Sequence, residues 1–133
     1  MLGGLILMLK SPQQKGKQFE RDMAKYLAKK FELPYKNSIR RTPCSGGIHE
    51  FMPQDIICMD KNSILARLHI ECKNTEKLNH HQVYWRTRHI ARAGTIPIVI
   101  HKKNFDIEPT IIIGLEDFCN LLLEIEELKR GIK

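Results

Sequence analysis

Residues 55–73 read Asp-Ile-Ile-Cys-Met-Asp-Lys-Asn-Ser-Ile-Leu-Ala-Arg-Leu-His-Ile-Glu-Cys-Lys. Two short apolar runs flank the polar residues 60–63, whose composition is typical of a turn, so the stretch predicts a β-hairpin. Apolar and polar residues alternate over residues 64–73. The second strand is therefore expected to have one apolar face, which includes Ile64 and Ile70.

The polar face of this strand carries Glu71 and Lys73 side by side. Asp55 opens the neighbouring strand and is expected within a few ångströms of Glu71. Two carboxylates and an ammonium group on one sheet face can bind a hard divalent cation beside a polarised water. For an isolated Glu-x-Lys tripeptide, a solvated face with ordinary surface charges is the better interpretation, so the rest of the chain must decide between the two.

Outside the hairpin, the pattern of apolar residues predicts an α/β fold with a mixed sheet. The predicted elements are, in order, a helix at 14–31, a strand at 35–41, the two hairpin strands, a helix at 79–93, strands at 96–101 and 110–113, and a helix at 115–129. Glu20 borders the apolar stripe of the first helix, where its carboxylate can look inward under the sheet. The alternative for Glu20 is a helix-surface position with no partner.

The 133 residues suit one domain, expected at 14–133 after an N-terminal extension at 1–13. The net charge of +7 is unevenly spread: residues 1–103 hold 19 Lys and Arg against 8 Asp and Glu, and residues 104–133 hold 3 against 7. A basic body with an acidic end favours a polyanionic partner, although excess lysine also aids solubility.

The four cysteines form no Cys-x-x-Cys pair, which argues against a zinc knuckle. Cys58 and Cys72 occupy apolar strand positions and are expected to be buried thiols, as in a reducing, intracellular and therefore cytoplasmic protein. The apolar residues 1–9 are too short for a membrane span, which needs about 20 residues, so no membrane association is expected.

Several basic residues are candidates for binding a phosphate backbone. They are Lys15 and Lys17 on the first helix, Arg40 and Arg41 at the end of the first strand, and Arg88 and Arg92 on the second helix. The last two share a helix face with Trp85, which could equally be a dimer surface or a solvated face. Ser45, in a Ser-Gly-Gly loop, could donate to a phosphate or belong to an ordinary glycine turn.

Five motifs in this order resemble the PD-(D/E)xK nuclease superfamily, and more narrowly the small Holliday-junction resolvases of archaea and phages. They are Lys-Gly-Lys-Gln-Phe-Glu-Arg at 15–21, Ser-Gly-Gly at 45–47, Pro-Gln-Asp at 53–55, Glu-Cys-Lys at 71–73, and Gln82 on the following helix. Gln54 departs from the pattern, because it separates the proline from the aspartate. The resemblance covers about residues 15–115 and implies a restriction-endonuclease-like core of order α-β-β-β-α-β-β-α.

The resemblance also implies a Mg²⁺-dependent DNA endonuclease, with Mn²⁺ as a substitute and no small-molecule cofactor. It assigns metal binding to Asp55, Glu71, the Cys72 backbone carbonyl and Glu20, and catalysis to these carboxylates with Lys73, Ser45 and Gln82. A homodimer that cuts a four-way DNA junction in a phage or prokaryotic host cell is expected, because two symmetric cuts require two active sites. The alternatives are a flap, mismatch or restriction-like nuclease of the same fold, a non-catalytic DNA-binding module, and a structural or interaction protein.

Overall fold

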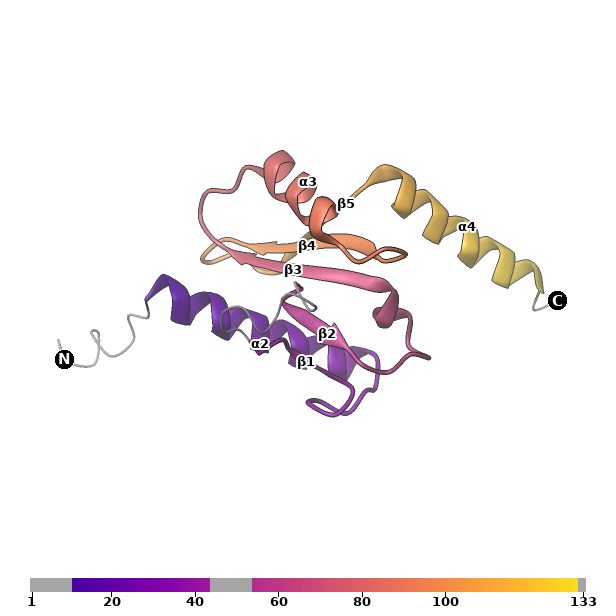
Figure 1. Ribbon diagram of the computed structural model, residues 1–133, viewed down its shortest axis with the longest axis horizontal. Helices are drawn as coiled ribbons and strands as arrows, with labels where there is room; N and C mark the ends of the chain where they lie inside the picture. The colour runs from indigo at the N-terminus through magenta and orange to yellow at the C-terminus, as the bar shows by residue number, and fades with distance from the viewer. Residues whose placement is uncertain (1–10, 44–53, 132–133) are drawn as a thin grey trace.

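The computed structural model describes residues 11–43 and 54–131 and confirms the expected α/β fold (Figure 1). In chain order its elements are α2 Pro12–Lys30, β1 Ile39–Arg41, β2 Ile56–Cys58, β3 Leu68–Asn74, α3 His80–Ile90, β4 Ile96–Lys102, β5 Thr110–Ile113 and α4 Leu115–Gly131. This is the α-β-β-β-α-β-β-α order of a restriction-endonuclease-like core.

The five strands form one mixed sheet in which spatial order follows chain order, β1-β2-β3-β4-β5. Neighbouring strands are antiparallel except β3 and β4, which run parallel and pair over the whole of residues 68–74 and 96–102. A parallel pair needs a crossover, and α3 provides it. The longest ladder of the sheet therefore supports β3, the strand that carries Glu71 and Lys73.

Helices cover both faces of the sheet: α2 lies on one face and α3 on the other (Figure 1). On the α2 face, Phe19 packs in a core cluster with Ile70 and Ile98. On the α3 face, Val99 is fully buried, as are Val83 and Thr87 of α3. Alternation thus sends apolar residues of β3 and β4 to the α2 layer and Val99 of β4 to the α3 layer, and Glu71 and Lys73 face away from the α2 core.

The expectation that the second hairpin strand begins at Ile64 is wrong, because residues Ile64–Arg67 form a short 3₁₀ helix before β3. Ser63 caps it, since its Oγ accepts a hydrogen bond of 3.2 Å from the Leu65 backbone N–H. The helical turn changes which side chains face inward. Leu65 is 3% exposed and joins the core, whereas Ile64 is 48% exposed.

Two other elements are shorter than the sequence pattern predicts. The strand expected from residue 35 begins only at Ile39, because Lys36 adopts a φ of 75° and its N–H donates to the Ile39 carbonyl across a tight turn. The helix expected to reach residue 93 ends at Ile90, and Ala91 is already extended. Gly94, with a φ of 82°, lies in the turn that follows.

The three helices are amphipathic rather than uniformly apolar. Within residues 11–43 and 54–131, no helix is both long and apolar enough to span a membrane. The apolar residues 1–9 lie outside the described residues, because the structure describes the N-terminal part of the chain only from residue 11. The predicted start of the domain at residue 14 falls inside α2. This helix begins at Pro12 behind a capping box, in which Ser11 and Gln14 exchange side-chain-to-backbone hydrogen bonds.

The 3₁₀ helix can be tested by comparing Ile70→Ala with Ile64→Ala. Ile70 is 1% exposed, so its truncation should lower the free energy of unfolding by about 2–5 kcal/mol in urea denaturation. Ile64→Ala should cost less than about 1 kcal/mol, because that side chain is half exposed. Similar losses in the two variants would instead support the continuous strand that the alternating sequence predicts.

Candidate active site

Asp55 lies immediately before β2 and is hydrogen-bonded to β3 through both its backbone and its side chain. Its N–H donates to the Ile70 carbonyl at 2.8 Å, and its Oδ2 accepts the Cys72 N–H at 2.8 Å. These two residues flank Glu71 in β3. Asp55 is therefore fixed beside Glu71, as the sequence predicts, and the charge of Glu71 acts directly on it.

Glu71 and Lys73 project from the same face of β3. The Lys73 Nζ lies 3.7 Å from Glu71 Oε1, and the two side chains are 28% and 13% exposed. A solvated surface pair would be more open than this. The ammonium group is thus held next to the carboxylates while part of it still reaches solvent.

Glu20 reaches the same cluster from α2. Its Oε2 accepts a 2.6 Å hydrogen bond from Arg41 Nε, and each of the two side chains is 17% exposed. The Glu20 charge also acts on Asp55 and Glu71. The alternative of an unpartnered helix-surface position is therefore wrong. Arg41, expected on a DNA-facing surface, is instead paired with Glu20 inside the cluster.

The crowding of carboxylates changes their protonation. Burial, the charge of Glu71 and contacts with Glu20 raise the pKa of Asp55 to about 8, against a smaller opposing effect of the Cys72 N–H. Burial also raises the pKa of Glu71, although the positive charge of Lys73 and a hydrogen bond with Asp55 oppose this. At neutral pH without a bound cation, the pair therefore keeps a proton on Asp55.

Asp55 and Glu71 offer the oxygen donors that hard divalent cations prefer, at a point where burial and neighbouring carboxylates disfavour two negative charges without a cation. Among the described residues, no group of three His, Cys, Asp or Glu side chains is placed to hold a metal ion. The side chains that could hold an ion here are therefore the two carboxylates, and the family resemblance implies the backbone carbonyl of Cys72 as a third ligand. Glu20 is engaged by Arg41 and lies outside this inner set.

The remaining candidate residues are spread around this cluster. Gln82 is exposed on α3 and, with Lys73, lines a hollow of about 220 Å³. Exposed or half-exposed side chains are also found at Lys15, Lys17, Arg40, Arg88 and Arg92. Ser45 falls in the stretch 44–53, outside the described residues. Burial of the Cys72 side chain raises the pKa of its thiol well above the usual range, so only its backbone is available to a ligand.

Arg86 is a candidate that the sequence pattern missed. It lines the same hollow as Lys73, Lys77 and Gln82, and its charge lowers the pKa of Glu71. The sequence pattern picks out the basic residues on the Trp85 face of α3, and Arg86 lies about a quarter turn away from that face. Its position one turn after Gln82 could have identified it, because residues four apart share a helix face.

One comparison with known proteins identifies relatives of this chain. A family model described as phage putative PDDEXK endonuclease matches residues 11–128. The match begins at the cap of α2, ends within α4, and includes the three carboxylates of the cluster and Lys73. No curated protein and no solved structure matches the chain.

The raised pKa of Asp55 predicts a pH-dependent stability in the absence of metal. The folded protein keeps this proton up to about pH 8, whereas the unfolded chain loses it near the ordinary value of 3.8, so this group destabilises the fold increasingly as pH rises between the two. Asp55→Asn keeps an acceptor for the Cys72 N–H and removes the titration. In EDTA, its unfolding free energy relative to wild type should be higher at pH 8 than at pH 5 by at least about 1 kcal/mol.

The matched control is Asp22→Asn, which changes an exposed carboxylate on α2. Its effect on the unfolding free energy should be the same at both pH values. An Asp55→Asn effect that is equally independent of pH would show that the Asp55 carboxyl is ionised in the folded protein and that the cluster lacks the proposed charge crowding.

Proposed function

Because the chain belongs to the phage PDDEXK endonuclease family, we propose that it is a Mg²⁺-dependent endonuclease that cuts branched DNA, with four-way junctions as its preferred substrate. The observation that carries this proposal is the convergence of Asp55, Glu71 and Lys73 at one face of β3. The proposed place of action is the reducing cytoplasm of a prokaryotic host cell.

Phosphodiester hydrolysis requires a nucleophilic hydroxide and neutralisation of a doubly negative pentacovalent phosphate. Asp55 and Glu71 would hold the cation, which in such sites polarises a phosphate oxygen and activates a water; Mn²⁺ has the same preference for oxygen ligands. The two carboxylates must be ionised to do so, and the proton on Asp55 has to leave as the ion arrives. Metal affinity should therefore rise with pH up to about 8.

Lys73 and Glu20 have separate roles in this proposal. The Lys73 ammonium, 3.7 Å from Glu71, is placed to orient the attacking water or to stabilise the charge of the transition state. Glu20, oriented by Arg41, would accept a hydrogen bond from a water of the ion's hydration shell. Gln82 and Ser45 are assigned supporting roles, in positioning Lys73 and in contacting the scissile phosphate.

The preference for a branch rests on how the basic residues are distributed. Lys15 and Lys17 lie at the start of α2, Arg40 on β1, Arg88 on α3, and Arg92 two residues beyond the end of α3. Contacts from three separate elements suit backbones that leave a crossover in different directions and read shape rather than base sequence. A homodimer would supply a second, symmetric set of contacts and the second active site that paired cuts require.

The decisive experiment compares a four-way junction with a linear duplex of the same sequence. We expect at least about tenfold tighter binding to the junction, and paired nicks placed symmetrically about the branch in Mg²⁺. Glu71→Gln should abolish the nicks but still bind junction DNA in Ca²⁺, because Glu71 serves the chemical step. The control Glu126→Gln, on the exposed surface of α4, should cut at the wild-type rate.

Two outcomes would count against the proposal in different ways. Wild-type cleavage by Glu71→Gln would remove the proposed metal site. Equal affinity for both DNAs with random nicking would remove the junction preference, and would leave a family endonuclease that acts on another DNA structure, such as a flap, a mismatch or a linear site.

Arg86 and Arg88 provide a matched pair for separating catalysis from general DNA affinity. Arg86→Ala should slow single-turnover cleavage by at least about tenfold even at saturating DNA, because Arg86 lies in the hollow next to Lys73. Arg88 stands over Trp85 on the neighbouring helix face. Arg88→Ala should leave the saturated rate unchanged and reduce the slope of log affinity against log salt by about one. Identical behaviour of the two variants would place both on one surface.

A further inference from the structure

The last helix, α4, is a 17-residue amphipathic helix without a buried residue. Its apolar stripe consists of Phe118, Leu121, Leu122, Ile125 and Leu128. Exposure within the stripe is 47% at Phe118 and Leu122 and 67% at Leu128. Figure 1 shows α4 extending away from the sheet, beyond the two layers that α2 and α3 form. Because helices of this length are marginal in water on their own, the stripe requires a partner surface.

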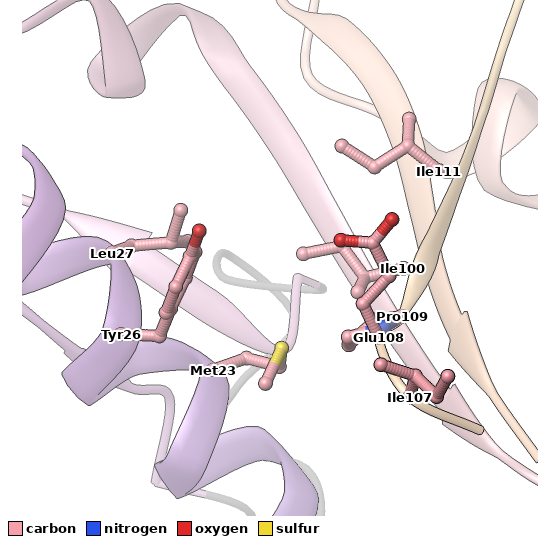
Figure 2. Close-up of a pocket in the computed structure, with 8 residues that line it drawn as sticks. All are labelled: Met23, Tyr26, Leu27, Ile100, Ile107, Glu108, Pro109 and Ile111. Carbon is pink, nitrogen blue, oxygen red and sulfur yellow. The ribbon is translucent and has the colours of Figure 1, made fainter.

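Among the residues that the structure describes, a second apolar surface is left open on the α2 face of the sheet, between α2 and the part of β4 and β5 around Ile100 and Ile111. There a hollow of about 450 Å³ separates the two walls seen in Figure 2. Met23, Tyr26 and Leu27 of α2 form one wall, and Ile100, Ile107 and Ile111 form most of the other. Tyr26 and Ile111 are more than half exposed and Ile107 is fully exposed. This opening can receive several aliphatic or aromatic side chains.

The geometry prevents α4 from filling the hollow of its own chain. The hollow lies beside the first residues of β5. In contrast, α4 begins at Leu115, and Gly114 alone connects it to Ile113, the last residue of β5. At Gly114 the chain passes so close to α3 that an added Cβ would lie 2.3 Å from the Tyr84 hydroxyl. This contact, and a 3.1 Å ion pair between Arg67 and Glu124, hold α4 beyond the end of the sheet and away from the hollow (Figure 1).

Charge favours a second copy of this chain as the partner. α4 has five acidic residues against two basic ones, whereas α2 has six basic residues against two acidic ones. The lining of the hollow includes one carboxylate, Glu108. Two lysines follow lining residues by helix and strand spacing: Lys30 lies one turn beyond Tyr26, and Lys102 lies two residues beyond Ile100 on the same strand face, so the basic residues of α2 and β4 outnumber this one acid. Pairing of α4 with another α4 would instead bring two acidic helices together, at an electrostatic cost.

We propose that α4 is a reciprocal dimerisation arm, which inserts its Phe118–Leu122–Ile125 stripe into the Met23–Ile107–Ile111 hollow of a second copy. A two-fold axis makes the exchange mutual, so that each copy gives one helix and receives one, and no open surface remains to propagate a fibre. The acidic flanks of α4 then meet the lysines at the edges of the hollow. This proposal rests on the homodimer of the proposed function and names its contact surfaces; its test needs neither metal nor DNA, so the arm and the nuclease activity can fail separately.

The test is light scattering on size-fractionated protein, with one substitution on each surface. Leu122→Glu changes the arm and Ile107→Glu changes the hollow; both side chains are solvent-exposed within one copy, so each variant should keep its fold by circular dichroism. Wild type should have a mass of about 31 kDa, twice the 15.5 kDa of one chain, and each variant should be a monomer. Met59→Glu, at an exposed apolar residue next to β2, is the control and should remain a dimer.

Mixing the two variants separates reciprocal exchange from other assemblies. A mixed pair regains one intact contact, the wild-type arm of the Ile107→Glu copy in the wild-type hollow of the Leu122→Glu copy, so the mixture should contain dimers that neither variant forms alone. Three results would overturn the proposal: a monomeric wild type, an Ile107→Glu variant that remains dimeric, and a Leu122→Glu variant that remains dimeric. The second would indicate pairing between the arms, and the third would assign the hollow to another segment.

Discussion

The hydrogen bond from the Cys72 N–H to Asp55 Oδ2 joins the fold of this protein to its chemistry. β2 is only three residues long, too short to fix a carboxylate by strand pairing alone. The contact ties Asp55 to β3, which in turn is held along its whole length by β4. The packing of the sheet against α2 and α3 holds β3 in place, and β3 in turn fixes the positions of Asp55 and Glu71. Asp55 cannot move away from Glu71 without loss of this bond, so the two carboxyl groups stay close although burial and the charge of Glu71 raise the pKa of Asp55 to about 8.

Much of this arrangement follows from short-range pattern. Period-two alternation places Glu71 and Lys73 together on β3, and the apolar stripe of α2 directs Glu20 toward the sheet. Both are local properties of one element, which is why they can be predicted from the sequence. The family resemblance adds the ordering of these elements in one core, and the match over residues 11–128 agrees with it.

The features that the pattern does not predict depend on contacts between distant parts of the chain or on local backbone geometry. The 3₁₀ helix before β3 begins at the Ser63 cap. The alternation of apolar residues over 64–73 predicts a strand there and does not indicate this helix. Arg41 pairs with Glu20, 21 positions earlier; alternation puts it on the buried face of Ile39 and Arg40 on the other, but the sequence near Arg41 does not identify its partner. The exposure of α4 is another such property, because its stripe has the same sequence signature whether its partner belongs to the same chain or to another copy.

The agreement between strand order in the sheet and strand order in the chain has a consequence for how the protein forms. Each strand pairs only with its neighbours in sequence, and a single helical crossover separates the one parallel pair. Loop closure is then short at every step, which is the topology associated with rapid folding. A chain leaving the ribosome can extend the sheet one strand at a time, since every new strand finds its partner already synthesised. The acidic cluster is complete once β3 has joined β2, before β4, β5 and α4 have been made.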